Sequence, residues 1–196
     1  MAKVSFNIKT PQTVTVKDWI AARVGGVQFV ASMSGQTPEQ VRNLPLNVFE
    51  TLKAKCEEVI NMVEPTDPHH GVAVGGVTYS IVPDFMDFEA GAMIDISEAD
   101  ERELTKYYTI VLSALFRPVL NRVGKFYTVE AYKATQRPEL LNIPLRYFRG
   151  AEAFFLTINK ELMTTSLNSL KEQTAKMRSL ISQNQTKTRW WRSMVG

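Results

Sequence analysis

The spacing of apolar residues along the chain predicts a mainly helical fold. Apolar positions recur every three to four residues in three long segments that we expect to form helices: residues 45–63, 98–117 and 143–182. Thr15 is followed three residues later by Asp18, a capping-box pattern that predicts a shorter helix over 13–23. The same pattern at Thr37 and Gln40 predicts one more helix start.

A smaller β component is expected beside these helices. Residues 3–9 alternate strictly between polar and apolar side chains, which predicts a strand. Residues 72–82 form two short β-type runs around Gly75-Gly76, and a glycine pair suits a tight turn with two positive φ angles, so a β-hairpin is expected. Residues 126–129 resemble a further strand. The predicted fold class is therefore α+β, mainly α, with a central apolar helix, a β-hairpin and a long C-terminal helix.

The helix over 98–117 is expected to lie at the centre of the fold. Its apolar side chains cover more than half of its circumference. Leu112 lies on it, and a charge introduced there is expected to prevent soluble folding. Arg117 stands between Phe116 and Pro118, and we expect it to be partly buried and paired with an acidic residue or with carbonyl groups at the helix end. The alternative is an ordinary surface arginine.

The C-terminal segments predict how the chain is organised. A helix over 143–182 would be roughly 55–60 Å long, which exceeds the diameter of about 30–40 Å expected for a compact chain of this size. Its C-terminal third is therefore expected to project, to pack on another chain, or to break. A polar run over 183–186 follows it. We expect one globular domain over 1–182 and a separate tail over 183–196.

The composition is that of a globular protein. Hydrophobic residues make up 44% of the chain and charged residues 22%, which argues against wholesale disorder. Cys56 is the only cysteine, so an intrachain disulfide is excluded. The sequence has no apolar run of the roughly 18 residues that a membrane span needs, and its start lacks a signal-peptide pattern. We therefore expect no membrane span and synthesis in the cytoplasm.

The net charge of +3 is unevenly distributed. Residues 171–196 carry six basic side chains and one acidic side chain, whereas the rest of the chain carries 17 basic and 19 acidic ones. In this tail Trp190 and Trp191 stand between Arg189 and Arg192, and these two residue types dominate binding hot spots. We therefore predict that the four residues bind a partner. Stacking on nucleic acid is a less favoured alternative, and a membrane interface, packing on the protein's own core or simple solvation stay open.

Candidate catalytic chemistry is sparse. His69 and His70 are adjacent and point in different directions, which suits loop residues better than ligands of one metal. The sequence contains no phosphate-binding loop and no Gly-x-Ser-x-Gly nucleophile motif. We therefore expect no enzymatic activity, no cofactor and no metal.

An acidic stretch is the one feature that favours catalysis. Residues 84–103 hold eight acidic side chains against Arg102 alone, and carboxylate pairs of this kind occur in metal-dependent nucleases. Helix capping and a solvated loop are the favoured interpretation. Ser97 with Asp100 resembles a capping box for the helix over 98–117, and acidic residues are favourable in the first turns of a helix.

Several motifs between about residues 30 and 165 resemble a family of tailed-bacteriophage proteins that are roughly as long as this chain. The family pattern has an acidic Ile-Asp-Ile/Leu segment, a helix ending in Leu-Tyr/Phe-Arg-Pro, a Tyr-x-x-x-x-Tyr segment, and Pro-Leu/Met followed by Phe-Phe and Leu. The matching positions here are Ile94–Ile96, Leu115–Pro118, Tyr127, Tyr132, Pro144–Leu145, Phe154–Phe155, Leu162 and the segment 34–45.

The resemblance implies a structural or assembly role and no enzymatic activity, and some members are treated as tail assembly chaperones. The first hypothesis is a non-enzymatic virion component, made in the host cytoplasm, that docks onto capsid, neck or tail proteins through its long C-terminal helix and tail. A homo-oligomer is a further option. The second hypothesis is a tail assembly chaperone that is absent from the mature virion. A metal-dependent nuclease is a remote third.

Overall fold

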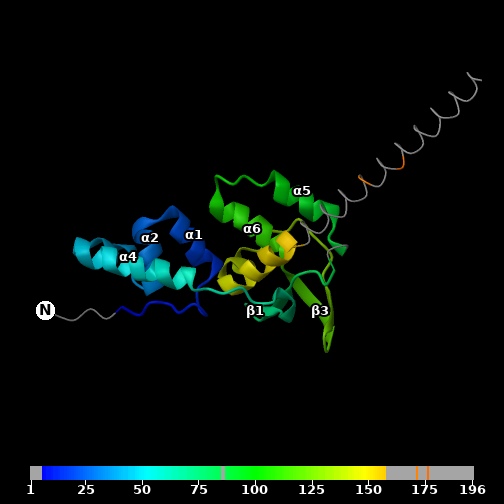
Figure 1. The fold of residues 1–196 in the computed structure, drawn as a ribbon, viewed down its shortest axis with the longest axis horizontal. Helices are drawn as coiled ribbons and strands as arrows, with labels where there is room; N and C mark the ends of the chain where they lie inside the picture. Colours follow the sequence, from blue (N-terminus) through cyan, green and yellow to red (C-terminus); the bar gives the residue numbers. More distant parts are fainter. Residues whose placement is uncertain (1–5, 85–86, 158–170, 172–175, 177–196) are drawn as a thin grey trace, which may run out of the picture. The chain divides into compact units, whose positions relative to one another are not determined.

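The fold is α+β and mainly helical, in agreement with the prediction. The computed structural model describes residues 6–84 and 87–157 together with Lys171 and Lys176. The chain divides into two compact units, residues 1–153 and 154–196, and the fold described here is that of the first unit (Figure 1). The expected boundary at residue 182 and the tail after it lie outside the described residues.

Helices precede and interrupt a small sheet. In chain order the elements are α1 (Val16–Val24), α2 (Gly26–Ser34), α3 (Pro38–Arg42), α4 (Leu46–Asn61), η1 (Pro68–His70), β1 (Val72–Val74), β2 (Val77–Ser80), α5 (Ala90–Glu98), α6 (Leu104–Leu115), β3 (Arg117–Val123), β4 (Phe126–Val129), η3 (Pro138–Asn142) and a helix that covers residues 145–157. The helices predicted over 13–23 and 45–63 correspond to α1 and α4. The predicted C-terminal helix is present as far as residue 157, and its expected extension to 182 falls largely on residues that are not described.

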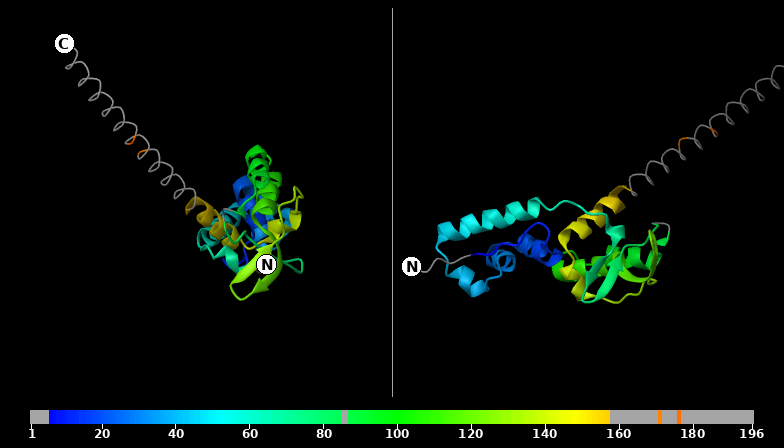
Figure 2. Two further views of the ribbon diagram at one scale, coloured as in Figure 1. Left: turned by 90° about the vertical axis from the view of Figure 1, so that its right-hand side faces the viewer. Right: turned by 90° about the horizontal axis from the view of Figure 1, so that it is seen from below.

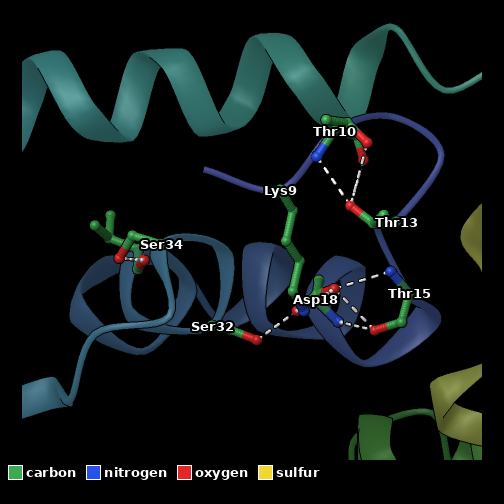
Figure 3. A network of polar contacts seen from close by, with 8 residues as sticks. Lys9, Thr10, Thr13, Thr15, Asp18, Ser32 and Ser34 are labelled. Atoms are coloured by element: carbon green, nitrogen blue, oxygen red, sulfur yellow. Dashed lines mark hydrogen bonds and ion pairs between the residues drawn. The ribbon is translucent and has the colours of Figure 1, made fainter. Parts of the chain in front are cut away.

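Helix α1 begins with the predicted capping box. The side chain of Thr15 accepts a hydrogen bond from the Asp18 amide, and the Asp18 carboxylate accepts one from the Thr15 amide at 2.8 Å. Asp18 is almost fully buried and also accepts hydrogen bonds from the Lys9 ammonium at 2.7 Å and from the Ser32 hydroxyl of α2 (Figure 3). Because a buried charge is costly unless it is paired and hydrogen-bonded, this network holds α1, α2 and the preceding segment together.

The strand predicted over 3–9 is wrong in the part of it that the structure describes. Residues 6–9 have no strand conformation, and the amide of Lys9 donates to the carbonyl of Met33 at 2.9 Å. The Lys9 side chain forms an ion pair with Asp18. An alternating pattern makes a strand only where a neighbouring strand completes the hydrogen-bond ladder, and here a helix end lies beside the segment instead.

The described strands form one antiparallel sheet in the order β1-β2-β3-β4. The predicted hairpin is confirmed as β1 and β2, and both turn residues, Gly75 and Gly76, have positive φ angles of 58° and 81°. Strand β3 joins the sheet where Arg117 pairs with Ser80 of β2. The segment 81–116, which contains α5 and α6, therefore connects two neighbouring strands of the sheet.

Helix α6 is the most buried helix of the fold, as expected for a central helix. It packs against α5, α1 and η3. Leu112 is fully buried. On the side of α1, the rings of Trp19, Tyr108 and Phe148 meet at centroid distances of 4.9–5.8 Å, so α6 joins the first and last helices of the unit.

The central helix is shorter than the predicted span of 98–117. The Asp100 carboxylate accepts a hydrogen bond from the Arg102 amide at 2.9 Å, a local turn that competes with helix formation. The expected capping box is absent from the described contacts, because the Ser97 hydroxyl donates to the Ile94 carbonyl inside α5. The acidic residues from Glu98 to Glu103 therefore precede α6 and do not form its first turns.

The start of the last helix is locked onto α1. The amide of Val16 donates to the carbonyl of Ile143, and the amide of Leu145 donates to the carbonyl of Val14 at 2.8 Å. One turn later the helix passes so close to the chain at Thr66 that a Cβ atom at Gly150 would overlap the Thr66 carbonyl. Glycine is therefore required at this crossing because a Cβ atom would not fit, and not because the backbone has a positive φ angle.

Candidate protein-docking site

The most exposed β structure of the described residues is a ribbon made of β3 and β4. The two strands pair from Val119 opposite Val129 to Val123 opposite Phe126. A two-residue turn at Gly124 and Lys125 connects them, and the Gly124 φ of 60° suits the first position of a type II′ turn. Beyond Pro118, β3 pairs with β4 alone, so the ribbon extends past the rest of the sheet (Figures 1 and 2).

One face of this ribbon is tied to the body of the unit. Arg122 and Tyr127 are directly opposite each other, so their side chains share a face. The Arg122 guanidinium lies 4.8 Å from the centre of the Tyr127 ring and donates to the carbonyls of His69 and His70 at 2.7 and 2.9 Å. The Tyr127 hydroxyl donates to the carbonyl of Ile81 at 2.9 Å. These contacts fix the orientation of the ribbon.

The opposite face of the ribbon carries exposed apolar side chains beside the exposed polar pair Asn121 and Thr128. Val123 and Phe126 form the last cross-strand pair, and their exposed fractions are 70% and 83%. Leu120, the extra residue at a register shift in β3, is also largely exposed. Large exposed apolar side chains that are held in a fixed orientation are typical of protein-binding surfaces. We name the exposed side chains of Leu120, Val123 and Phe126 the ribbon tip.

Arg117 anchors the base of the ribbon. Its side chain is 2% exposed, and its Nη1 atom donates to both carboxylate oxygens of Glu89 at 2.6 and 2.7 Å. Its Nε atom donates to the carbonyl of Ala114 at the end of α6. The guanidinium carbon lies 5.4 Å from the ring centres of both Phe88 and Tyr132. The expected burial and pairing of Arg117 are therefore confirmed, although it begins a strand and does not end a helix.

Two further contacts connect this base to α5. The carboxylate of Glu89, which precedes the first turn of α5, accepts a hydrogen bond from the Tyr132 amide at 2.9 Å. The Tyr132 hydroxyl donates to the Asp95 carboxylate in the middle of α5. The ring of Tyr132 also packs on Gly91, where a Cβ atom would still fit. The ribbon base, α5 and the segment after β4 therefore form one connected unit.

The protonation states at this base follow from its contacts. Partial burial raises the pKa of Glu89, but hydrogen bonds from the Tyr132 amide and the Arg117 guanidinium outweigh it and bring the pKa below its usual value. Burial and the hydrogen bond to Asp95 raise the pKa of Tyr132 to about 12. At neutral pH Glu89 is therefore ionised, and Tyr132 keeps the proton that it donates.

Several residues of the acidic stretch make structural contacts. Glu89 pairs with Arg117, Asp95 accepts from Tyr132, and Asp100 pairs with Arg102. A pocket of about 270 Å³ beside α5 has Asp95 and Glu98 among its lining residues. In the residues that the structure describes, no group of three His, Cys, Asp or Glu side chains is placed to hold a metal ion.

The histidines predicted to lie in a loop are in the short helix η1. His69 Nδ1 lies 2.8 Å from the Asp67 carboxylate, and both histidine carbonyls accept from Arg122. Cys56 is buried in α4, and burial followed by the charge of Glu57 raises the pKa of its thiol to about 11. None of the described helices is both long and apolar enough to cross a membrane.

Sequence patterns predict the base of this site but not its tip. Leu112 and Arg117 are both buried, as predicted. The predicted partner-binding residues Arg189, Trp190, Trp191 and Arg192 lie outside the described residues. The signal that could have found the ribbon is the apolar run before Gly124-Lys125, which mirrors the strand-like run after it. The family models, curated proteins and solved structures searched with this chain gave no match.

Proposed function

We propose that this protein is a non-enzymatic structural or assembly protein of a tailed-bacteriophage virion that docks onto larger phage proteins. The phage assignment rests on the sequence motifs around Ile94–Ile96 and Leu115–Pro118. The docking role is carried by one observation, the exposed pair Val123 and Phe126 on a ribbon that Arg122 and Tyr127 hold in place. A surface that is already ordered loses little conformational entropy when a partner binds.

The long C-terminal helix and the tail remain part of this proposal. Tryptophan and arginine side chains in a basic segment suit insertion into a partner's pocket, which supports Arg189, Trp190, Trp191 and Arg192 as a second contact. Nucleic acid is a less favoured partner for the same segment. We place the protein in the virion after synthesis in the host cytoplasm.

Mass spectrometry of purified virions tests this proposal against its main alternative. A virion component is expected at a fixed stoichiometry to the major structural proteins. A tail assembly chaperone would be abundant in the infected cell and absent from the particle. Absence from the particle would therefore overturn the virion assignment in favour of the chaperone.

A metal-dependent nuclease is the remote alternative. The use of Glu89, Asp95 and Asp100 in contacts with Arg117, Tyr132 and Arg102 supports a structural role for the acidic stretch instead. A cleavage assay on DNA with and without Mg²⁺ tests this point directly. Mg²⁺-dependent cleavage that is lost on replacing Asp84 and Asp87 with asparagine would overturn the non-enzymatic assignment.

A further inference from the structure

Helix α5 presents an apolar stripe that faces away from the fold. Ala90, Met93, Ile94 and Ser97 are exposed and are spaced three or four residues apart, so they share one face of the helix. Met93 and Ile94 are 48% and 51% exposed, whereas Ala92 on the inner face is fully buried. The Glu89 and Asp95 contacts fix α5 against the ribbon base and leave this stripe uncovered. We name these four residues the α5 stripe.

The charges around the α5 stripe and the ribbon tip have opposite signs. The α5 stripe lies in the segment 84–103, which carries eight acidic residues and one basic residue. Glu98, the last residue of α5, and Glu101, three residues beyond it, are exposed. The ribbon carries Lys125 in its turn and no acidic residue between 117 and 129, while Arg122 faces the body of the unit. Each surface therefore combines exposed apolar side chains with charges that the other surface complements.

The two surfaces cannot meet within one molecule. Arg117 at the ribbon base is already in contact with Glu89 at the start of α5, and β3 then runs away from it for six residues, about 20 Å at the usual rise of a strand. Figures 1 and 2 show the tip of the ribbon pointing away from α5. The contacts of Arg122 and Tyr127 prevent the ribbon from folding back.

We propose that the ribbon tip of one copy docks on the α5 stripe of a second copy. Because this contact joins two different surfaces, two copies either make it reciprocally in a two-fold dimer, or it continues from copy to copy until it closes into a ring or grows as a filament. The proposal rests on described residues of the first unit alone. It is therefore independent of whether the protein stays in the virion or acts as a chaperone.

Light scattering coupled to size-exclusion chromatography tests this contact on the full chain. The wild-type protein is expected to associate as its concentration rises, and to associate less at high salt because exposed opposite charges are screened. Phe126→Asp on the ribbon tip and Ile94→Lys on the α5 stripe are each expected to give monomers. Leu46→Asp is the matched control, since Leu46 is another largely exposed apolar residue and an acidic side chain is favourable in the first turn of α4.

Mixing the two variants gives the sharpest test. The Phe126→Asp protein keeps an intact α5 stripe, and the Ile94→Lys protein keeps an intact ribbon tip. An equimolar mixture is therefore expected to form a heterodimer and no larger species, which neither a misfolded variant nor a contact between two ribbon tips can produce.

Several outcomes would overturn the proposal. A wild-type protein that stays monomeric up to about 1 mM, where even millimolar association would be visible, would exclude the contact. Association that survives both substitutions would place the interface elsewhere, for example in the C-terminal segment. Loss of association in Phe126→Asp but not in Ile94→Lys would mean that ribbons pair with each other.

Discussion

At the residue scale, the contacts of Arg117 explain why a cation is buried beside an apolar helix. The guanidinium satisfies the carbonyl of Ala114, which the end of α6 leaves without an intrahelical donor, and it binds both oxygens of Glu89. Its flat faces are covered by aromatic rings, which a lysine ammonium could not match as well. One side chain therefore connects the end of α6, the start of α5 and the base of the ribbon.

Replacing Arg117 with alanine is expected to lower the free energy of unfolding by roughly 2–3 kcal/mol, because a buried ion pair is broken and a cavity is left. Arg117→Lys should recover only part of this loss, since it keeps the charge but loses the Nε hydrogen bond to Ala114 and the planar faces that contact the aromatic rings. Urea unfolding measures both. Arg102→Ala removes an exposed ion pair and serves as a control that should change little. Unchanged stability in both Arg117 variants would show that the pairing has no structural role.

The ion pair also makes a specific contribution to pH dependence. The pKa of Glu89 is lowered in the folded protein, so its stabilising effect is present above the ordinary carboxyl pKa of 4.5 and is lost as the pH falls through the lower folded value. Glu89→Gln should therefore destabilise the protein at neutral pH and cost progressively less below pH 4.5. Unfolding free energies of both proteins across this range provide the measurement. A stability difference that is constant with pH would contradict the assignment.

At the element scale, sequence patterns predicted what is decided locally. The capping boxes at Thr15 and Thr37 and the Gly75-Gly76 turn need only neighbouring residues, and all three are present. Strand β3 was missed because its pairing with β2 crosses residues 81–116, which no local pattern records. The pairing of Glu89 with Arg117 could not be predicted for the same reason, since 28 positions separate the two residues. The exposure of Phe126 likewise depends on where the sheet ends.

The close contact between Gly150 and Thr66 predicts that a glycine-to-alanine substitution in this helix lowers stability, the opposite of the usual effect. Exchanging a helical glycine for alanine usually stabilises a helix by about 1 kcal/mol. Gly150→Ala is instead expected to lower stability by roughly 1–3 kcal/mol, because the new methyl group would overlap the Thr66 carbonyl and crowd Pro68.

Gly91→Ala in α5 is the matched control for this prediction. A Cβ atom at Gly91 would lie 3.6 Å from the Tyr132 ring, an ordinary contact, so this variant should gain stability. Thermal melts of the two variants decide the point. A higher melting temperature for Gly150→Ala would mean that the helix does not pass this close to Thr66.

The central position of α6 predicts the effect of a charge at Leu112. Leu112→Asp is expected to prevent soluble folding, because an unpaired buried carboxylate is very costly. Leu112→Ala should remain folded with a loss of about 2–5 kcal/mol from the lost contacts and the cavity. A soluble Leu112→Asp protein that melts cooperatively would contradict the central role of α6.

At the scale of the whole molecule, the first unit contains the folding core and the segment 154–196 forms the second compact unit. The capping box of α1, the bridge from Val14 and Val16 to the start of the last helix, and the Arg117 contacts all lie before residue 154. The first unit therefore carries its own stabilising contacts.

Deleting residues 183–196 is expected to leave the melting temperature nearly unchanged and to abolish incorporation into the phage particle or binding to the partner. The polar run 183–186 offers no apolar side chain to a core, whereas the tryptophan and arginine residues beyond it are hot-spot types. Calorimetry and virion composition measure the two effects. Unfolding of the truncated protein would mean that the tail packs on its own core, and normal assembly would mean that it is merely solvated.

The long connection between β2 and β3 also affects how the protein folds. Each of the two hairpins closes over a two-residue turn and can form within microseconds. Joining Ser80 to Arg117 instead requires the chain over 81–116 to close into a loop, at an entropic cost of about 3 kcal/mol for a flexible segment of this length. That cost is recovered only when α5 and α6 have packed and Glu89 has met Arg117. We therefore expect the folding rate to be set by these two helices and not by either hairpin.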